Sequence, residues 1–102
     1  MKFSEQCYLL LRKVPIGKVT TYKEIAEALK TKAYRAVGKA MKQNIDAPKI
    51  PCHRVVCSNG NIGGYMGSDK ENIKSKIELL RAEGVDIKYN KIDLDKYLYK
   101  FE

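Results

Sequence analysis

Apolar residues recur at helical spacing near the start of the chain and predict a first helix. Positions i, i+3, i+4 and i+7 of this stretch are all hydrophobic: Cys7, Leu10, Leu11 and Val14. Ser4 is the expected N-cap, because its hydroxyl can accept from a free amide of the first turn. Pro15 and Gly17 then end the helix.

Two further short helices are predicted between residues 21 and 42. Thr21 and Glu24 form a capping box that opens the first of them. Its inward face holds Tyr22, Ile25, Ala26 and Leu29. After a turn at residues 31–32, the second helix turns its small and apolar residues inward: Ala33, Ala36, Val37, Ala40 and Met41. Two short helices joined by a tight turn are typical of a helix-turn-helix.

Short strands follow a loop that contains two prolines. Val55 and Val56 predict a buried strand, and Asn59-Gly60 is the strongest hairpin signal in the chain. Strands beside a helix-turn-helix suggest a winged helix in which the hairpin is the wing. We therefore expect a mostly helical α/β fold, a winged helix-turn-helix DNA-binding domain, in one domain over residues 1–102.

The last third of the chain predicts more helix than strand. Ser68 and Glu71 form another capping box, and the helix they open should stop at Gly84. Apolar alternation over residues 85–89 predicts a short strand. A final amphipathic helix is expected from one apolar stripe: Leu94, Tyr97, Leu98 and Phe101.

Charge is distributed unevenly along the 102 residues, whose net charge is +8. Residues 1–60 hold 12 Lys and Arg against 4 acids, whereas residues 61–102 hold 8 of each sign. One-sided basicity of this kind is the footprint of a polyanion partner, most often nucleic acid. A solvated, lysine-rich face explains the charge equally well.

Cysteine usage and hydropathy exclude several classes. The three cysteines are odd in number and lack CxxC spacing, so we expect neither a disulfide framework nor a zinc site. No apolar run approaches the roughly 20 residues of a membrane span, and no signal peptide begins the chain. A cytoplasmic protein is expected, or a nuclear one if the source has a nucleus.

Candidate chemistry centres on Cys52, which lies between Pro51 and His53, the only histidine. A neighbouring imidazole can draw a thiol toward the nucleophilic thiolate. A bare Cys-His pair is more often a small buried cysteine beside a core histidine. The surrounding motifs reverse that balance. Cys57 should face the opposite side of the strand and belong to the core.

The ordered motifs resemble those of the O6-alkylguanine-DNA alkyltransferases (methylated-DNA–protein-cysteine methyltransferases). The Pro-Cys-His-Arg-Val-Val run at 51–56 resembles the active-site motif of that family. Other matching segments are 17–22, 35–41, the asparagine hinge at Asn44 and Pro48, Gly63-Gly64-Tyr65 and 82–84. Pro-Cys-His-Arg alone is moderately specific, whereas this ordered set over about residues 3–88 is highly specific.

The resemblance implies a DNA repair protein. It would flip O6-alkylguanine out of duplex DNA and transfer the alkyl group to Cys52 as a monomer without cofactor or metal. The product is a thioether that nothing in the sequence can break, so each molecule should act once. Double-stranded DNA containing the lesion is the implied partner, and no membrane is involved.

By the same resemblance, five residues carry the chemistry. Cys52 attacks the alkyl carbon, His53 draws its proton through a water, and Glu83 orients His53. Tyr22 donates a hydrogen bond to a ring nitrogen of the leaving base, and Asn44 braces the turn that carries Cys52. Taken singly, these residues have plainer readings: a half-buried aromatic, a helix-end acid or a loop former.

The implied substrate and DNA contacts lie on three segments. Arg35 would enter the base stack as the nucleotide leaves, while Ala36, Gly38 and Lys39 lie along the sugar-phosphate backbone in the minor groove. Arg54 and the Val55 carbonyl would meet the substrate, and Tyr65 and Met66 would line its pocket. A surface arginine on a basic helix is the plainer reading of Arg35.

Three departures from the family are expected to matter. The family's N-terminal domain is expected to be absent, Met66 replaces the usual serine or alanine, and the tail beyond about residue 89 carries no family motif. The main alternative is an alkyltransferase-like lesion sensor, a class that carries tryptophan in place of the reactive cysteine. A winged-helix regulator with structural cysteines and a Cys-His-Glu hydrolase are further alternatives.

Overall fold

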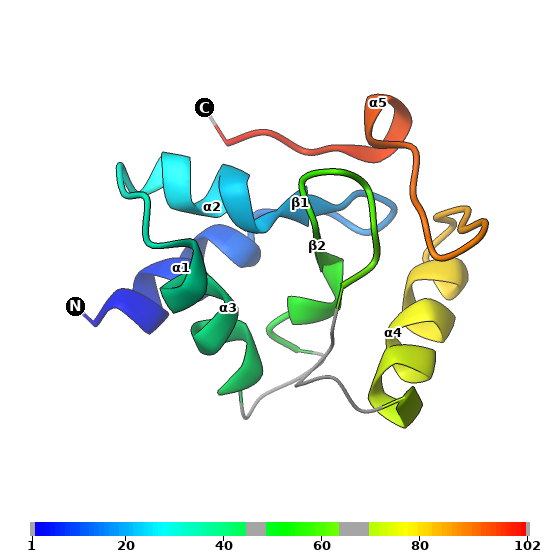
Figure 1. The fold of residues 1–102 in the computed structure, drawn as a ribbon, viewed down its shortest axis with the longest axis horizontal. Helices are drawn as coiled ribbons and strands as arrows, with labels where there is room; N and C mark the ends of the chain where they lie inside the picture. The colour runs from blue at the N-terminus through cyan, green and yellow to red at the C-terminus, as the bar shows by residue number, and fades with distance from the viewer. Residues whose placement is uncertain (1, 45–48, 64–69, 102) are drawn as a thin grey trace.

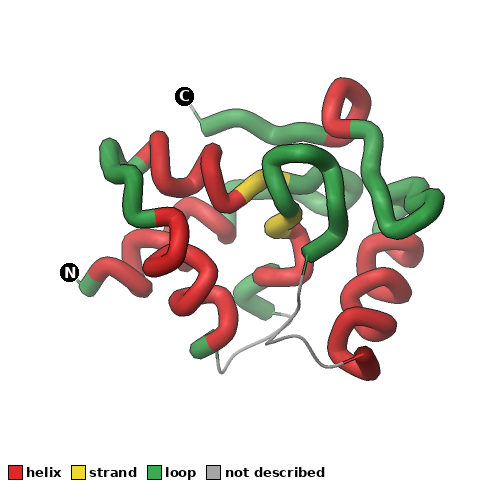
Figure 2. Tube along the Cα trace, in the orientation of Figure 1, coloured by secondary structure: helices red, strands yellow, loops and turns green. Residues whose placement is uncertain are grey.

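The computed structural model describes residues 2–44, 49–63 and 70–101. Figures 1 and 2 show a mostly helical chain with one small sheet at its centre. The elements follow one another as α1 (Phe3–Leu11), β1 (Thr20–Thr21), α2 (Tyr22–Ala28), α3 (Tyr34–Lys42), the 3-10 turn η1 (Cys52–Arg54), β2 (Val55–Val56), α4 (Lys70–Ala82) and α5 (Leu94–Tyr97). Helices α1, α2 and α3 pack together on one side of the sheet in Figure 1, and α4 lies on the other.

The sheet joins distant parts of the sequence in parallel. Thr20 pairs with Val55 and Thr21 with Val56. The C-terminal segment extends this sheet, because the amide of Val19 donates to the carbonyl of Tyr97 at 2.9 Å and the amide of Tyr99 donates to Val19 at 2.7 Å. The chain end thereby crosses over the helical half of the molecule (Figure 1).

Strand β2 separates two apolar clusters, because neighbouring strand residues face opposite sides. Val55 belongs to the cluster under α1, α2 and α3, and Val56 to the cluster under α4 and the C-terminal segment. The first cluster comprises Cys7, Leu11, Val14, Ile25, Ala26, Val37, Ala40, Met41, Ile50, Cys52 and Val55. The second comprises Val19, Val56, Ile62, Leu80, Val85, Ile87, Ile92 and Tyr97.

Two of the predicted helix signals are confirmed and one is wrong. The Thr21 hydroxyl accepts from the Glu24 amide at 3.0 Å and opens α2. Gly84 follows α4 at φ +94°, the left-handed conformation expected after a helix. Helix α1, however, begins at Phe3 with Lys2 at its N-cap, so Ser4 lies inside the helix.

The predicted turn at Asn59-Gly60 is present, but among the described residues no strand pairing continues beyond it. The Gly60 amide donates to the Cys57 carbonyl at 2.9 Å, and the Cys57 amide donates to the Asn61 carbonyl at 2.8 Å. Beyond Asn61 the chain does not run back along β2: the Ile62 amide donates to the Asn90 carbonyl, and the Ile92 amide donates to the Gly60 carbonyl. Strand β2 pairs with β1 instead, since that partner buries both of its valines.

The C-terminal elements also differ from expectation. Val85 and Ile87 are buried as the alternation predicted, but Tyr89 has φ +52° and is 99% exposed, and residues 85–89 form no strand. Helix α5 is a single turn, because Leu98 is already extended and bridges to Val19. Ala33, predicted to face inward, is exposed just before α3.

Two glycines should respond oppositely to alanine. Gly60 has φ +90°, and a Cβ there would lie 2.8 Å from the Ile92 carbonyl oxygen, so Gly60→Ala should lower the free energy of unfolding by about 2 kcal/mol. Gly38 lies inside α3, and apart from the backbone of that helix and its chain neighbours no atom of the described residues lies within 4 Å of an added Cβ. Gly38→Ala should therefore raise it by about 0.5–1 kcal/mol. Urea unfolding midpoints check both; equal effects would contradict the described turn.

Candidate functional site

The turn that carries Cys52 is fixed by backbone hydrogen bonds. The Cys52 amide donates to the Ile50 carbonyl at 2.8 Å, and the Arg54 amide donates to Pro51 at 3.0 Å. The buried Asn44 amide group donates to the same Ile50 carbonyl at 2.8 Å. Residues 50–54 are thus held as one short 3-10 turn before β2.

Glu83 joins this turn to the end of α4. The Nε2 atom of His53 lies 3.0 Å from Oε2 of Glu83. Arg54 binds the same carboxylate in a bidentate manner, at 2.9 Å through Nε and 2.7 Å through Nη2. Its Nη1 donates to the Val14 carbonyl at 2.8 Å. The carboxylate therefore holds an imidazole and a guanidinium side by side.

Burial and partners set the charges of this network. Burial alone would raise the pKa of Glu83, but hydrogen bonds from Arg54 and His53 outweigh it and lower the pKa. Burial lowers the pKa of His53, and the Glu83 carboxylate offsets only part of that effect. Near neutral pH the carboxylate is ionised and the imidazole neutral. Its Nε2 then carries the hydrogen toward Glu83, which leaves Nδ1 as the basic nitrogen.

Cys52 itself is more covered than the sequence suggests. It is 3% exposed and packs in the first apolar cluster. The described residues that line the neighbouring cavity do not include it. The structure therefore places Cys52 among packed neighbours rather than among the described residues that line the cavity.

The neighbouring cavity has a volume of about 450 Å³ and lies where α2 and α3 begin and β2 ends. Among the described residues it is lined by Tyr22, Lys23, Tyr34, Cys57 and Ser58. Burial, followed by the charges of Cys57 and Cys52, raises the pKa of Tyr22 to about 12. Its hydroxyl is therefore protonated at neutral pH and can donate. The thiols of Cys57 and Cys52 both lie close enough to Tyr22 to raise its pKa electrostatically.

Cys57 was predicted to be core and is instead partly exposed in this cavity. Strand β2 has only two residues, and the chain turns at Cys57, so strand alternation does not reach it. Gly63 packs close to Cys57 and Tyr22: a Cβ at this position would lie 3.1 Å from the Cys57 sulfur and 3.7 Å from the Tyr22 hydroxyl oxygen.

Lys76 is a site residue that the sequence reasoning missed. It is 0% exposed, and its Nζ donates to the carbonyls of Val55 and Ile62, each at 2.6 Å. Burial lowers its pKa to about 8, and the nearby Cys57 and Cys52 counteract this. A signal was present, because Lys76 lies on the apolar face of α4, three residues after Ile73 and four before Leu80.

Two predicted substrate contacts have internal partners. Three nitrogens of Arg54 bind Glu83 and Val14, so its guanidinium serves the network rather than an outside ligand. The Val55 carbonyl already accepts from Lys76. Tyr65, Met66, Gly64 and Pro48, also predicted around the pocket and hinge, lie outside the described residues.

Helix α3 presents the predicted DNA contacts on its outer side. Arg35 and Lys39 are exposed, while Ala36 and Gly38 are half-buried. Val37, Ala40 and Met41 on the opposite side are buried. The space around Gly38 is open within the described part of this chain, so an outside backbone can approach the helix there.

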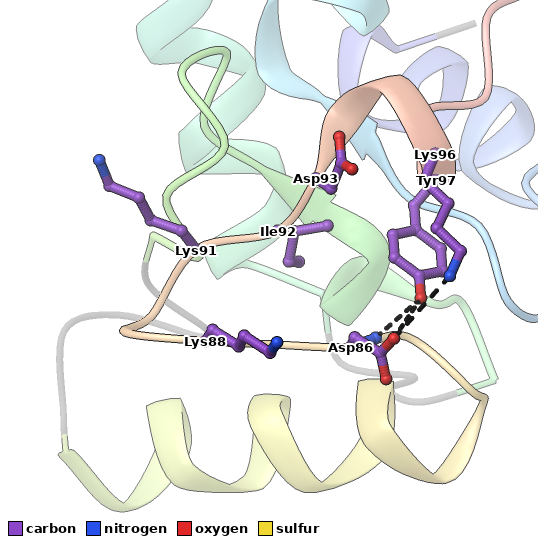
Figure 3. Close-up of a pocket in the computed structure, with 7 residues that line it drawn as sticks. All are labelled: Asp86, Lys88, Lys91, Ile92, Asp93, Lys96 and Tyr97. Carbon is purple, nitrogen blue, oxygen red and sulfur yellow. Dashed lines mark hydrogen bonds and ion pairs between the residues drawn. The ribbon is translucent and has the colours of Figure 1, made fainter.

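A second cavity of about 430 Å³ lies between the 86–93 segment and α5 (Figure 3). Its lining residues are Asp86, Lys88, Lys91, Ile92, Asp93, Lys96 and Tyr97. The Tyr97 hydroxyl donates to Asp86 at 3.0 Å. None of the predicted site residues lines it. Among the described residues, no group of three His, Cys, Asp or Glu could hold a metal ion, and no helix is long and apolar enough to cross a membrane.

Comparison with known proteins gives the class. The family of the 6-O-methylguanine DNA methyltransferase DNA-binding domain matches residues 2–85. A bifunctional methyltransferase/endonuclease of Picrophilus torridus is 43% identical over 94 residues, 90% of this chain and 30% of that protein. A methylated-DNA–protein-cysteine methyltransferase of Candida glabrata is 47% identical over 94 residues, 87% of this chain and 45% of that protein.

Solved structures agree. S. pombe Atl1, in complex with damaged DNA containing O6-carboxymethylguanine, superposes with a TM-score of 0.86 at 31% identity, covering 99% of this chain and 100% of that chain. The O6-methylguanine-DNA methyltransferase of Pyrococcus kodakaraensis gives 0.71 at 44% identity over 83% of this chain and 47% of that one. M. tuberculosis OGT in complex with DNA gives 0.73 at 36% identity, with 81% and 50% covered.

The chain belongs to the 6-O-methylguanine DNA methyltransferase family. Its fold is the mostly helical α/β fold with a small parallel sheet seen in the structures it resembles. It spans 30% and 45% of the length of the two curated relatives.

Lys76 should make stability depend on pH. The folded protein releases the Lys76 proton near its lowered pKa of about 8, whereas the unfolded chain holds it up to 10.5. Across that window the unfolded state binds more protons, so the free energy of unfolding of the wild type should rise relative to Lys76→Met. Urea unfolding of both proteins at about pH 7 and about pH 10 measures this. If the difference in free energy of unfolding between the wild type and Lys76→Met were the same at both pH values, the lowered pKa of Lys76 would be contradicted.

Proposed function

We propose that this protein repairs DNA by transferring the alkyl group of O6-alkylguanine irreversibly to Cys52. The observation that carries the proposal is the hydrogen-bonded pair of His53 and Glu83, 3.0 Å apart, beside a cysteine in a braced turn. A neutral imidazole oriented by an ionised carboxylate is the arrangement that activates a neighbouring nucleophile. We infer that residues 1–102 act as one domain of the C-terminal, catalytic type of the family, which the full-length match to Atl1 supports.

Duplex DNA is the proposed partner. Helices α2 and α3 would act as the helix-turn-helix, with the exposed Arg35 and Lys39 on the outer side of α3. Such cations neutralise phosphates, and a guanidinium can fill the space that a flipped nucleotide leaves. Atl1 and M. tuberculosis OGT were both solved with DNA, which supports this partner.

The transfer is a single displacement. The Cys52 sulfur forms a bond to the alkyl carbon, the bond from that carbon to O6 breaks, and its electron pair stays with guanine. The thiol proton passes through a water to Nδ1 of His53, while Glu83 holds the hydrogen on Nε2. The protonated Tyr22 hydroxyl donates to the base as negative charge develops.

Lys76 adds a positive charge to this mechanism. Its buried ammonium interacts electrostatically with both Cys52 and Cys57. Its hydrogen bond to Val55 also fixes the strand that follows the nucleophile. The lysine thus assists from behind β2 without needing to touch the lesion.

A lesion sensor without transfer is the second candidate. Two observations favour it: Cys52 is only 3% exposed, and Atl1 matches over its whole chain. The reactive cysteine and the intact His53–Glu83 pair favour transfer, because binding alone needs neither. We therefore retain alkyl transfer as the main proposal.

Incubation with duplex DNA carrying a labelled O6-methylguanine should move one label onto each protein molecule. Cys52→Ala should abolish transfer, because it removes the thiol that directly precedes His53. Cys57→Ala is the matched control: it removes the other thiol but leaves Cys52 and the His53–Glu83 pair in place, so transfer to Cys52 should persist. Tight binding of the wild type to the lesion without label transfer would establish the sensor instead.

Glu83→Gln should slow transfer about a hundredfold, because a neutral amide no longer fixes the His53 tautomer. Lesion binding should change little. The two measurements are the single-turnover rate of transfer, which should fall, and the dissociation constant for the lesion duplex, which should stay close to that of the wild type. Glu78→Gln on the exposed side of α4 is the control. Equal rates for the two variants would show that the carboxylate only stabilises the fold.

A further inference from the structure

Two aromatic rings line the cavity beside the thiols, and the mechanism above uses only one of them. Tyr22 begins α2 and Tyr34 begins α3. Tyr22 is half-buried and interacts electrostatically with Cys52 and Cys57, whereas Tyr34 is 43% exposed. Tyr22 therefore lies on the side of the cavity nearer the thiols, and the more exposed Tyr34 lies nearer to solvent.

Hydrogen bonds fix the backbone position of Tyr34 at the beginning of α3. The Tyr34 amide donates to the Lys32 carbonyl at 2.9 Å, and the Ala33 amide donates to the Thr31 hydroxyl at 3.1 Å. A turn with these bonds sets the first residue of α3 before any ligand arrives. A backbone that is ordered before binding lowers the conformational cost of presenting this side chain to a ligand.

The cavity has the size and chemistry of a site for a flat, polar ring. Its volume of about 450 Å³ falls within the range of small-molecule pockets. Ser58 and the Tyr22 hydroxyl offer hydrogen bonds, and Lys23 adds a cation at the rim. An exposed tyrosine ring beside such groups suits stacking on a nucleobase.

We propose that Tyr34 is a binding residue for the extruded nucleotide and stacks on the flipped base at the mouth of the cavity. This inference rests on the proposed function, since it takes an extruded guanine as the ligand. Tyr34 directly precedes Arg35, so the residue that fills the vacated stack and the residue that receives the base are neighbours on α3. The first two residues of α3 would then stabilise the flipped state in two ways: Arg35 fills the gap in the base stack, and Tyr34 stacks on the extruded base.

The test compares binding to two duplexes that differ only in one O6-methylguanine. Tyr34→Ala should weaken binding to the lesion duplex about tenfold, equivalent to about 1.4 kcal/mol. Its binding to the unmodified duplex should change less than about twofold. Tyr34→Phe should behave like the wild type, because the ring and not the hydroxyl makes the contact. Circular dichroism confirms that each variant is folded.

Tyr89→Asn is the control. Tyr89 is 99% exposed and is not among the residues that line the cavity, and asparagine tolerates its positive φ. This variant should bind both duplexes as the wild type does.

Each remaining outcome has one meaning. A wild type that does not prefer the lesion duplex overturns the proposed function together with this inference. A wild type that prefers the lesion, with Tyr34→Ala unchanged, overturns the inference alone. Equal losses on both duplexes also overturn it, because Tyr34 would then be an ordinary DNA contact outside the cavity.

Discussion

The carboxylate of Glu83 is the contact on which the site depends. It accepts from Arg54 through both of its oxygens and bonds His53, and Arg54 in turn reaches the Val14 carbonyl beyond α1. Helix α4, the turn at 52–54 and the end of the first helical segment are thereby tied at one point. The orientation of the imidazole consequently follows from how α4 docks, and the same ion pair that stabilises the fold sets the proton chemistry.

Local signals predicted local structure well. The Thr21 cap and the left-handed Gly84 depend on a few consecutive residues, and both were found. The pairing of His53 with Glu83 was expected only from the family resemblance, since no local pattern joins residues thirty positions apart. The parallel pairing of β1 with β2 escaped prediction for the same reason: Asn59-Gly60 favours a local turn, but distant Thr20 and Thr21 are the partners.

Lys76 and Cys57 show a second limit of sequence reasoning. A prediction from hydrophobic periodicity does not expect a buried lysine on the apolar face of a helix. Lys76 is nevertheless 0% exposed, because its ammonium donates to two carbonyls and lies near two thiols. Alternation placed Cys57 in the core because it assumes a continuing strand, and β2 ends one residue earlier. The result is a buried Cys52, whereas the second thiol, Cys57, lines a cavity.

The location of the alkyl group after reaction tests this account most directly. Trypsin separates the two thiols, because it cleaves after Lys49 and Arg54 and leaves Cys52 on peptide 50–54 and Cys57 on the peptide that begins at Val55. After incubation with O6-methylguanine duplex, tandem mass spectrometry should find the methyl group on peptide 50–54 alone. A methyl group on the Cys57 peptide, or on neither, would contradict the assignment of Cys52 as the nucleophile served by His53 and Glu83.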